Sequence, residues 1–211
     1  MTPQVFAGEA AVFGLWYLVA FTGGRPRILK TLVKTASVGG LAVAVNLVGG
    51  PVWLVAALAL GAAGDACLTV PTRSAFMAGL LAFAASHIAY IVLFLETGAM
   101  PHPLTAWPVA IYGFVMLRQL WVPSGDLRWP VAFYVAVISV MGMAALMLPE
   151  PFRPAIFAAF AFVLSDSLLA KEIFVWPEGH PARRWSGYAV WALYWGAQAG
   201  FAWVFALGAA F

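Results

Sequence analysis

Charged residues are scarce in this chain: they make up only 9% of its 211 residues, whereas 64% are hydrophobic. A soluble domain carries roughly 25% charged residues. Such a domain could not bury so much apolar surface, so the composition indicates a polytopic membrane protein. The apolar runs are continuous and long, which excludes the alternating segments of about ten residues that a membrane β-barrel needs.

Cysteine is almost absent as well. Cys67 is the single cysteine, so no disulfide can form within the chain. The three histidines are far apart and no His/Cys cluster has the spacing of metal ligands, so we expect neither a metal nor a cofactor. The N-terminus lacks the basic region of a cleaved signal peptide, and we expect its first apolar run to remain as a helix. We expect membrane lipid as a partner and no nucleic acid; no pattern indicates an oligomeric state.

Eight apolar runs predict an all-α protein with eight transmembrane helices in one domain, residues 1–211. The runs cover about 5–22, 28–47, 52–70, 75–96, 105–121, 130–148, 154–171 and 185–209. The connections between them are short and contain Gly, Pro, Ser or Asp, which is typical of turns. Two parallel four-helix halves, about 1–97 and 98–211, are a further hypothesis for this domain.

Basic residues are concentrated in alternate connections. One side holds Arg25, Arg27, Arg73, Arg128, Arg183 and Arg184, whereas the loops of the opposite side hold only Arg153. Cytoplasmic loops of membrane proteins carry the excess of Lys and Arg. We therefore expect a protein of the bacterial inner membrane, with an even number of passes and both termini outside the cytoplasm.

Two aspartates interrupt the apolar runs, Asp65 in GAAGDACLTV and Asp166 in AFVLSDSLLA. Each lies about five residues inside the cytoplasmic end of its helix, a depth of roughly 7–8 Å. An ionisable residue within a span is a functional-site hypothesis by default. The matched depth favours two carboxylates that face one interior cavity. The alternative is that they only form polar contacts between helices.

Lys30 and Lys34 are four residues apart at the start of the second run, so both ammonium groups lie on one helix face. Carboxylates or a lipid phosphate are their natural partners, and a lysine that extends to the membrane interface is the alternative for Lys30. His87 and Tyr90 share one face in the middle of the fourth run. A buried histidine with a purely structural hydrogen bond is the alternative there.

The last run carries Tyr194 and Gln198, which belong to a stripe of aromatic residues at helical spacing. Such a stripe is more often packing than a site. A glutamine near the middle of the membrane nevertheless needs a hydrogen-bonding partner.

Five segments in order, KTLVKT, GDACL, SHIAYIVLF, FVLSDSLLA and YWGAQ, resemble the YhhN-like membrane proteins, a family that includes the lysoplasmalogenases. The resemblance covers nearly the whole chain. It implies an eight-helix hydrolase that cleaves the vinyl ether bond of a lysoplasmalogen to a fatty aldehyde and a glycerophospho-alcohol. Asp65 and Asp166 would be its catalytic residues. The family's lysine motif is usually Lys-Pro, whereas threonine follows both Lys30 and Lys34 here.

Vinyl ether hydrolysis explains why two carboxyl groups would be needed. The slow step is protonation of the alkenyl carbon, and an ionised carboxylate stabilises the resulting cation or activates water, as in glycoside hydrolysis. We favour Asp166 as the acid and Asp65 as the ionised partner of Lys34. The phosphate candidates are Lys30, Lys34 and Arg118, and the candidate donors deeper in the pocket are His87, Tyr90, Tyr194 and Gln198.

Two other functions fit the same pattern. A small proton-coupled carrier could use either aspartate as its proton site, although neither lies at the membrane midplane, where such sites are found. A non-catalytic membrane protein would use the aspartates only to join helices. Aldehyde release from a lysoplasmalogen distinguishes the hydrolase from both alternatives.

Overall fold

The computed structural model of the chain describes residues 2–22, 28–99 and 103–209. Within these ranges eight long α-helices are present, and no β-strand occurs among the described residues. The helices are α1 Pro3–Ala20, α2 Ile28–Leu47, α3 Val52–Leu68, α4 Arg73–Glu96, α5 Pro103–Trp121, α6 Arg128–Ala145, α7 Pro154–Phe174 and α8 Ser186–Phe205. Four short 3₁₀ helices follow or join them, η1 Gly125–Leu127, η2 Glu150–Phe152, η3 Pro181–Arg184 and η4 Leu207–Ala209. The expected all-α architecture is confirmed.

Proline, threonine and glycine mark the helix ends. Pro3 and Pro154 occupy first turns, where the missing N–H of proline has no partner to lose. The Thr72 hydroxyl accepts a hydrogen bond from the Ala75 N–H at 3.2 Å and caps α4. Gly49 and Gly98 follow α2 and α4 with φ values of +72° and +85°, which side-chain-bearing residues rarely adopt. These local rules account for the element boundaries.

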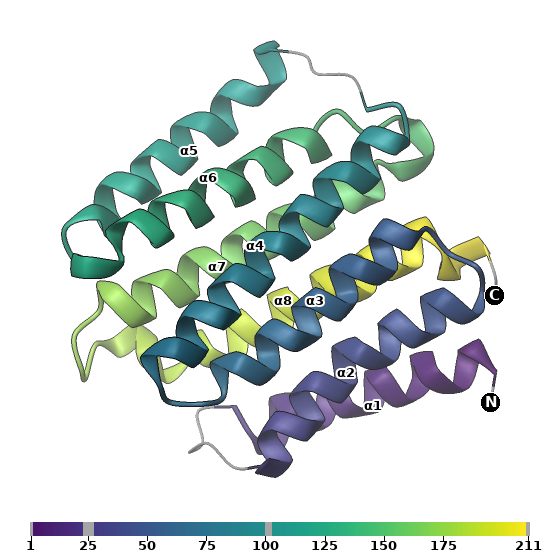
Figure 1. Ribbon diagram of the computed structural model, residues 1–211, viewed down its shortest axis with the longest axis horizontal. Helices are drawn as coiled ribbons and strands as arrows, with labels where there is room; N and C mark the ends of the chain where they lie inside the picture. Colours follow the sequence, from purple (N-terminus) through teal and green to yellow (C-terminus); the bar gives the residue numbers. More distant parts are fainter. Residues whose placement is uncertain (1, 23–27, 100–102, 210–211) are drawn as a thin grey trace.

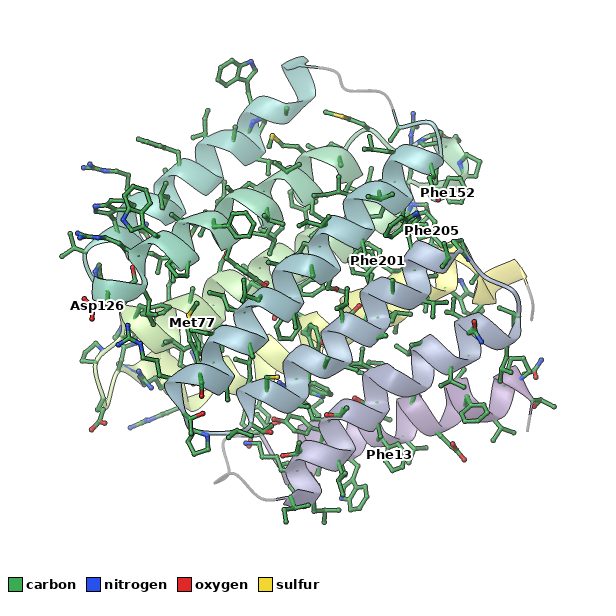
Figure 2. The ribbon with its side chains drawn as sticks, viewed as in Figure 1. Phe13, Met77, Asp126, Phe152, Phe201 and Phe205 are labelled. Atoms are coloured by element: carbon green, nitrogen blue, oxygen red, sulfur yellow. The ribbon has the colours of Figure 1, made fainter. Side chains whose placement is uncertain are left out.

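The helices lie side by side as one bundle, with α1 and α5 at opposite edges and α3, α4, α7 and α8 between them (Figure 1). The C-terminal helix α8 contacts α1, α2, α3 and α7, so it joins the two ends of the chain. Both termini lie at one end of the bundle. Phe152 and Phe205 stack at that end with ring centroids 5.0 Å apart, and Asp126 lies at the other end (Figure 2).

Within the described part of the chain, three segments are long and apolar enough to cross a membrane: Ile28–Leu47, Arg73–Glu96 and Gly125–Ala145. Large side chains such as Val19, Ile28 and Phe157 are exposed on the outside of the bundle, as lipid contact requires. The chain is therefore an all-α membrane protein, and the count of eight passes stays a prediction. Arg25 and Arg27, on which the expected orientation partly rests, lie outside the described residues.

Candidate active site

A cavity inside the bundle has walls from seven helices, α2 to α8. The space between its walls is about 1030 Å³, part of it open to the outside. Asp65 and Asp166 both line it, and Lys34 lies beside them. Most of the remaining wall is apolar, with Leu80 from α4 and Val131 from α6 as examples. The two aspartates, which are distant in sequence, thus line the same largely apolar cavity.

Asp65 is closed in by α2 and α8. Its Oδ1 lies 2.7 Å from the Lys34 Nζ, and its Oδ2 accepts a hydrogen bond from the Tyr194 hydroxyl at 2.8 Å. Only 1% of the side chain is exposed. The neighbouring Gly64 lets α4 approach, because a Cβ there would lie 2.7 Å from the ring of Phe83. The small residues around Asp65 therefore allow the close packing that shelters the ion pair.

Lys34 is surrounded by aromatic rings as well as by its carboxylate. Its Nζ lies 5.9 Å from the ring centroid of Tyr17, 5.6 Å from that of Trp191 and 6.0 Å from that of Tyr194. Such distances permit cation–π attraction. The ammonium group thus pairs with Asp65, one of the two kinds of partner that the sequence allowed.

Asp166 has a different set of partners, from α4 and α6. The Tyr134 hydroxyl donates a hydrogen bond to its Oδ2. The Nε2 of His87 lies 3.3 Å from the same oxygen and 3.0 Å from the Tyr134 hydroxyl. With its proton on Nε2, His87 donates to the carboxylate. The Asp166 side chain is 14% exposed, against 1% for Asp65, so Asp166 is the more accessible of the two carboxyl groups that line the cavity.

Tyr90 and Gln198 form a buried pair behind the cavity. The Tyr90 hydroxyl donates to the Oε1 of Gln198, and both side chains are fully buried. A Cβ added at Gly61 would lie 2.6 Å from the Gln198 Nε2 and 3.2 Å from the Tyr194 hydroxyl. The absence of a side chain at position 61 therefore leaves room for the amide beside the tyrosine that binds Asp65.

The structure brings some of the predicted site residues to the cavity and leaves others outside it. Asp65, Asp166, Lys34 and Tyr194 line the cavity. His87, Tyr90 and Gln198 are buried one layer behind its wall. Lys30 is half-buried near the start of α2, with its Nζ 5.8 Å from the ring centroid of Tyr17, and Arg118 is exposed on α5; neither lines the cavity.

Sequence reasoning missed five polar residues of the cavity wall: Tyr112, Tyr134, Ser139, Ser165 and Ser167. Tyr112 donates to the Ser167 Oγ at 2.8 Å, and Tyr134 binds Asp166. Ser167 directly follows Asp166, which was a usable signal. The two tyrosines stand in ordinary apolar runs, where nothing in the spacing distinguishes a tyrosine facing a cavity from one facing lipid.

Comparison with known proteins agrees with the family resemblance of the sequence motifs. The YhhN family model matches residues 29–205. A protein of Mycobacterium bovis named lysoplasmalogenase is 30% identical over 131 residues, which are 58% of this chain and 50% of that relative. A protein of Sus scrofa named lysoplasmalogenase TMEM86B is 32% identical over 170 residues, 79% of this chain and 73% of the relative.

The human protein of the same name is 33% identical over 126 residues, which are 59% of this chain and 52% of that protein. The chain thus aligns with about half the length of the mycobacterial and human relatives. No solved structure matches the chain.

Proposed function

The chain belongs to the YhhN family, and we propose on this premise that it hydrolyses the vinyl ether bond of a lysoplasmalogen. The products would be a fatty aldehyde and glycerophosphoethanolamine or glycerophosphocholine. The names of the relatives favour this reaction class. The observation that carries the proposal is the pair of carboxyl groups at one apolar cavity, each with different hydrogen-bonding partners.

Asp166 is the general acid in this proposal. Its carboxyl proton goes to the outer alkenyl carbon, and the ether oxygen then shares the positive charge of an oxocarbenium ion. The Oδ2 of Asp166 already accepts the Tyr134 hydroxyl, so the transferable proton belongs on Oδ1. The exposure of Asp166 to the cavity supports this role, because a general acid must come within hydrogen-bonding distance of the atom it protonates.

Asp65 is the ionised partner. The Lys34 ammonium at 2.7 Å and the Tyr194 hydroxyl at 2.8 Å both favour a negatively charged carboxylate. A negative charge at the cavity stabilises the developing cation by electrostatic attraction. Lys34 acts through Asp65 in this scheme and does not touch the substrate.

The remaining steps restore the enzyme. Water adds to the cationic carbon, and its proton returns to the Asp166 carboxylate. The hemiacetal that results collapses to the aldehyde, and the hydroxyl proton of the hemiacetal ends on the glycerol oxygen. One water is consumed and no net proton is gained or lost. His87 positions Asp166 and Tyr134 throughout, since its Nε2 contacts both.

Aldehyde release by the purified protein tests the proposal, with 1-alkenyl lysophosphatidylethanolamine and lysophosphatidylcholine as substrates. We expect turnover by the wild type and a loss of at least about a thousandfold in kcat for Asp65→Asn and for Asp166→Asn. Asp126→Asn is the matched control, because the Asp126 side chain is 88% exposed and does not line the cavity. Its turnover should equal that of the wild type.

Folded wild-type protein that releases no aldehyde from either lipid would contradict the hydrolase. The proton-coupled carrier would then become the leading function. Turnover that survives in Asp166→Asn at the wild-type rate would remove Asp166 from the chemistry while leaving the reaction in place.

A further inference from the structure

The hydroxyl groups of the cavity share one chemical property. Among the residues that the structure describes, six hydroxyl-bearing side chains line the cavity: Tyr112, Tyr134, Ser139, Ser165, Ser167 and Tyr194. A hydroxyl group carries one proton to donate and two lone pairs to accept. The partner of each hydroxyl proton therefore decides whether the cavity presents hydrogen-bond donors or acceptors to a ligand.

All six hydroxyl protons are used inside the protein. Tyr134 and Tyr194 donate to the two aspartates. The serines donate to main-chain carbonyl oxygens: Ser139 to Val135, Ser165 to Val190 and Ser167 to Val163. Tyr112 donates to the Ser167 Oγ at 2.8 Å. These hydroxyl groups consequently present only acceptor lone pairs, and they fit a ligand that donates.

Tyr112 and Ser167 are two acceptors of the cavity wall that contact each other beside the proposed acid. Ser167 directly follows Asp166 on α7, so the Cα atoms of the acid and the serine are about 3.8 Å apart. Tyr112 reaches the same serine from α5, and both side chains line the cavity. A substrate held for protonation by Asp166 would therefore carry its adjoining glycerol carbons close to this pair.

We propose that Tyr112 and Ser167 bind the free hydroxyl on the central glycerol carbon and so select lipids without an acyl chain there. This inference rests on the proposed vinyl ether hydrolysis. The hydroxyl is only a few bonds from the alkenyl group and donates a proton that the Tyr112–Ser167 pair can accept. An ester at the same carbon has only acceptor oxygens, which would face the lone pairs of both side chains without a hydrogen bond.

Three synthetic 1-alkenyl lipids with one chain and one headgroup test the assignment. Their central glycerol carbon carries a hydroxyl, a methyl ether or hydrogen, and kcat/KM is measured for each. We expect the wild type to prefer the hydroxyl lipid over the hydrogen lipid by about tenfold, which corresponds to the net free energy of one neutral hydrogen bond. The methyl ether lipid should be no better than the hydrogen lipid.

Tyr112→Phe and Ser167→Ala should each reduce this preference to about twofold or less, by lowering kcat/KM for the hydroxyl lipid alone. Tyr188→Phe is the matched control, since Tyr188 is exposed on α8 and does not line the cavity; it should keep the tenfold preference. The ratio is taken within each variant, so a smaller fraction of folded protein does not alter it.

Two outcomes would overturn the assignment while leaving the hydrolase intact. One is a wild-type preference that persists in both variants. The other is an equal loss on all three lipids, which would give the Tyr112–Ser167 hydrogen bond a role only in holding α5 to α7. No aldehyde from any lipid with folded wild-type protein would instead contradict the proposed function itself, and this assignment with it.

Discussion

Two tyrosines at the cavity each donate a hydrogen bond to one of the two aspartates. Tyr194 donates to the Oδ2 of Asp65, and Tyr134 donates to the Oδ2 of Asp166. The nitrogen partners differ: an ammonium group pairs with Asp65, whereas an imidazole lies beside Asp166. The two carboxyl groups therefore have different surroundings in one cavity, as the proposed division into acid and ionised partner requires.

Lys34 offers a test of the Asp65 ion pair. Lys34→Met leaves a buried carboxylate without its counter-ion, and we expect a loss of about 3 kcal/mol in the free energy of unfolding. The double variant Lys34→Met with Asp65→Leu should regain most of that stability, because no unpaired charge remains. Thermal or denaturant unfolding of the purified protein in detergent measures both changes.

Measurements of activity separate the contribution of the Lys34–Asp65 pair to stability from the proposed role of Asp65 in catalysis. The double variant should be stable yet release no aldehyde, since it lacks the ionised carboxylate. Arg118→Met serves as the control for a lost basic residue, because Arg118 is exposed; its stability should stay within about 0.5 kcal/mol of the wild type. A double variant that is as unstable as Lys34→Met would contradict the ion-pair account.

The sequence identified the charged members of the site more readily than its neutral ones. Asp65, Asp166 and Lys34 are conspicuous because a charge within an apolar run is costly. A tyrosine such as Tyr134 carries no charge, so its burial in an apolar run has no comparable free-energy cost. Only the packing of α6 against α7 shows that Tyr134 donates a hydrogen bond to Asp166. His87 and Tyr90 were placed on one face of α4, yet they bind different partners because different helices pack over them.

At the level of elements, α3 and α4 pack closely through glycines from both helices. A Cβ at Gly64 would lie 2.7 Å from the Phe83 ring, and one at Gly79 would lie 2.8 Å from Leu68. Phe83 in turn contacts Tyr194 edge to face, with ring centroids 5.7 Å apart. The packing of α3 against α4 therefore positions Phe83, which contacts the tyrosine that donates a hydrogen bond to Asp65.

Gly64→Ala tests that fit. The added methyl group must displace the Phe83 ring, and we expect a loss of about 1–3 kcal/mol in stability together with reduced turnover. Gly8→Ala in α1 is the matched control, because a Cβ there meets nothing within 4 Å. It should stabilise the protein by about 0.5–1 kcal/mol, as alanine does in an open helix position. Equal unfolding midpoints for the two variants would refute the packing argument.

Helix boundaries were predictable to within a few residues, and for α2 the expected run 28–47 coincides with Ile28–Leu47. Prolines and glycines in the connections carry this information locally. The lateral order of the helices was not predictable, because apolar helix faces of similar composition do not specify their neighbours. The position of α5 at an edge of the bundle is one such result (Figure 1).

For the whole molecule, the segregation of basic residues predicts an orientation that labelling can check. Glu150 in η2 and Arg184 in η3 are both exposed. Each is replaced by cysteine in turn, in a Cys67→Ser protein that has no other cysteine. A membrane-impermeant maleimide should label Glu150→Cys in intact cells, and Arg184→Cys only after permeabilisation. The Cys67→Ser protein without a new cysteine is the control. The reverse pattern would invert the orientation, and labelling of both in intact cells would contradict the count of eight passes.

For each of the two aspartates, a residue that contacts it precedes it in the sequence and is therefore synthesised first. Lys34 precedes Asp65 along the chain, and His87 and Tyr134 both precede Asp166. A growing chain emerges N-terminus first. Each acidic side chain therefore reaches the bilayer after a partner for it has already been made. The helix α8 is synthesised last, and it supplies both the Tyr194 hydrogen bond to Asp65 and the last wall of the cavity.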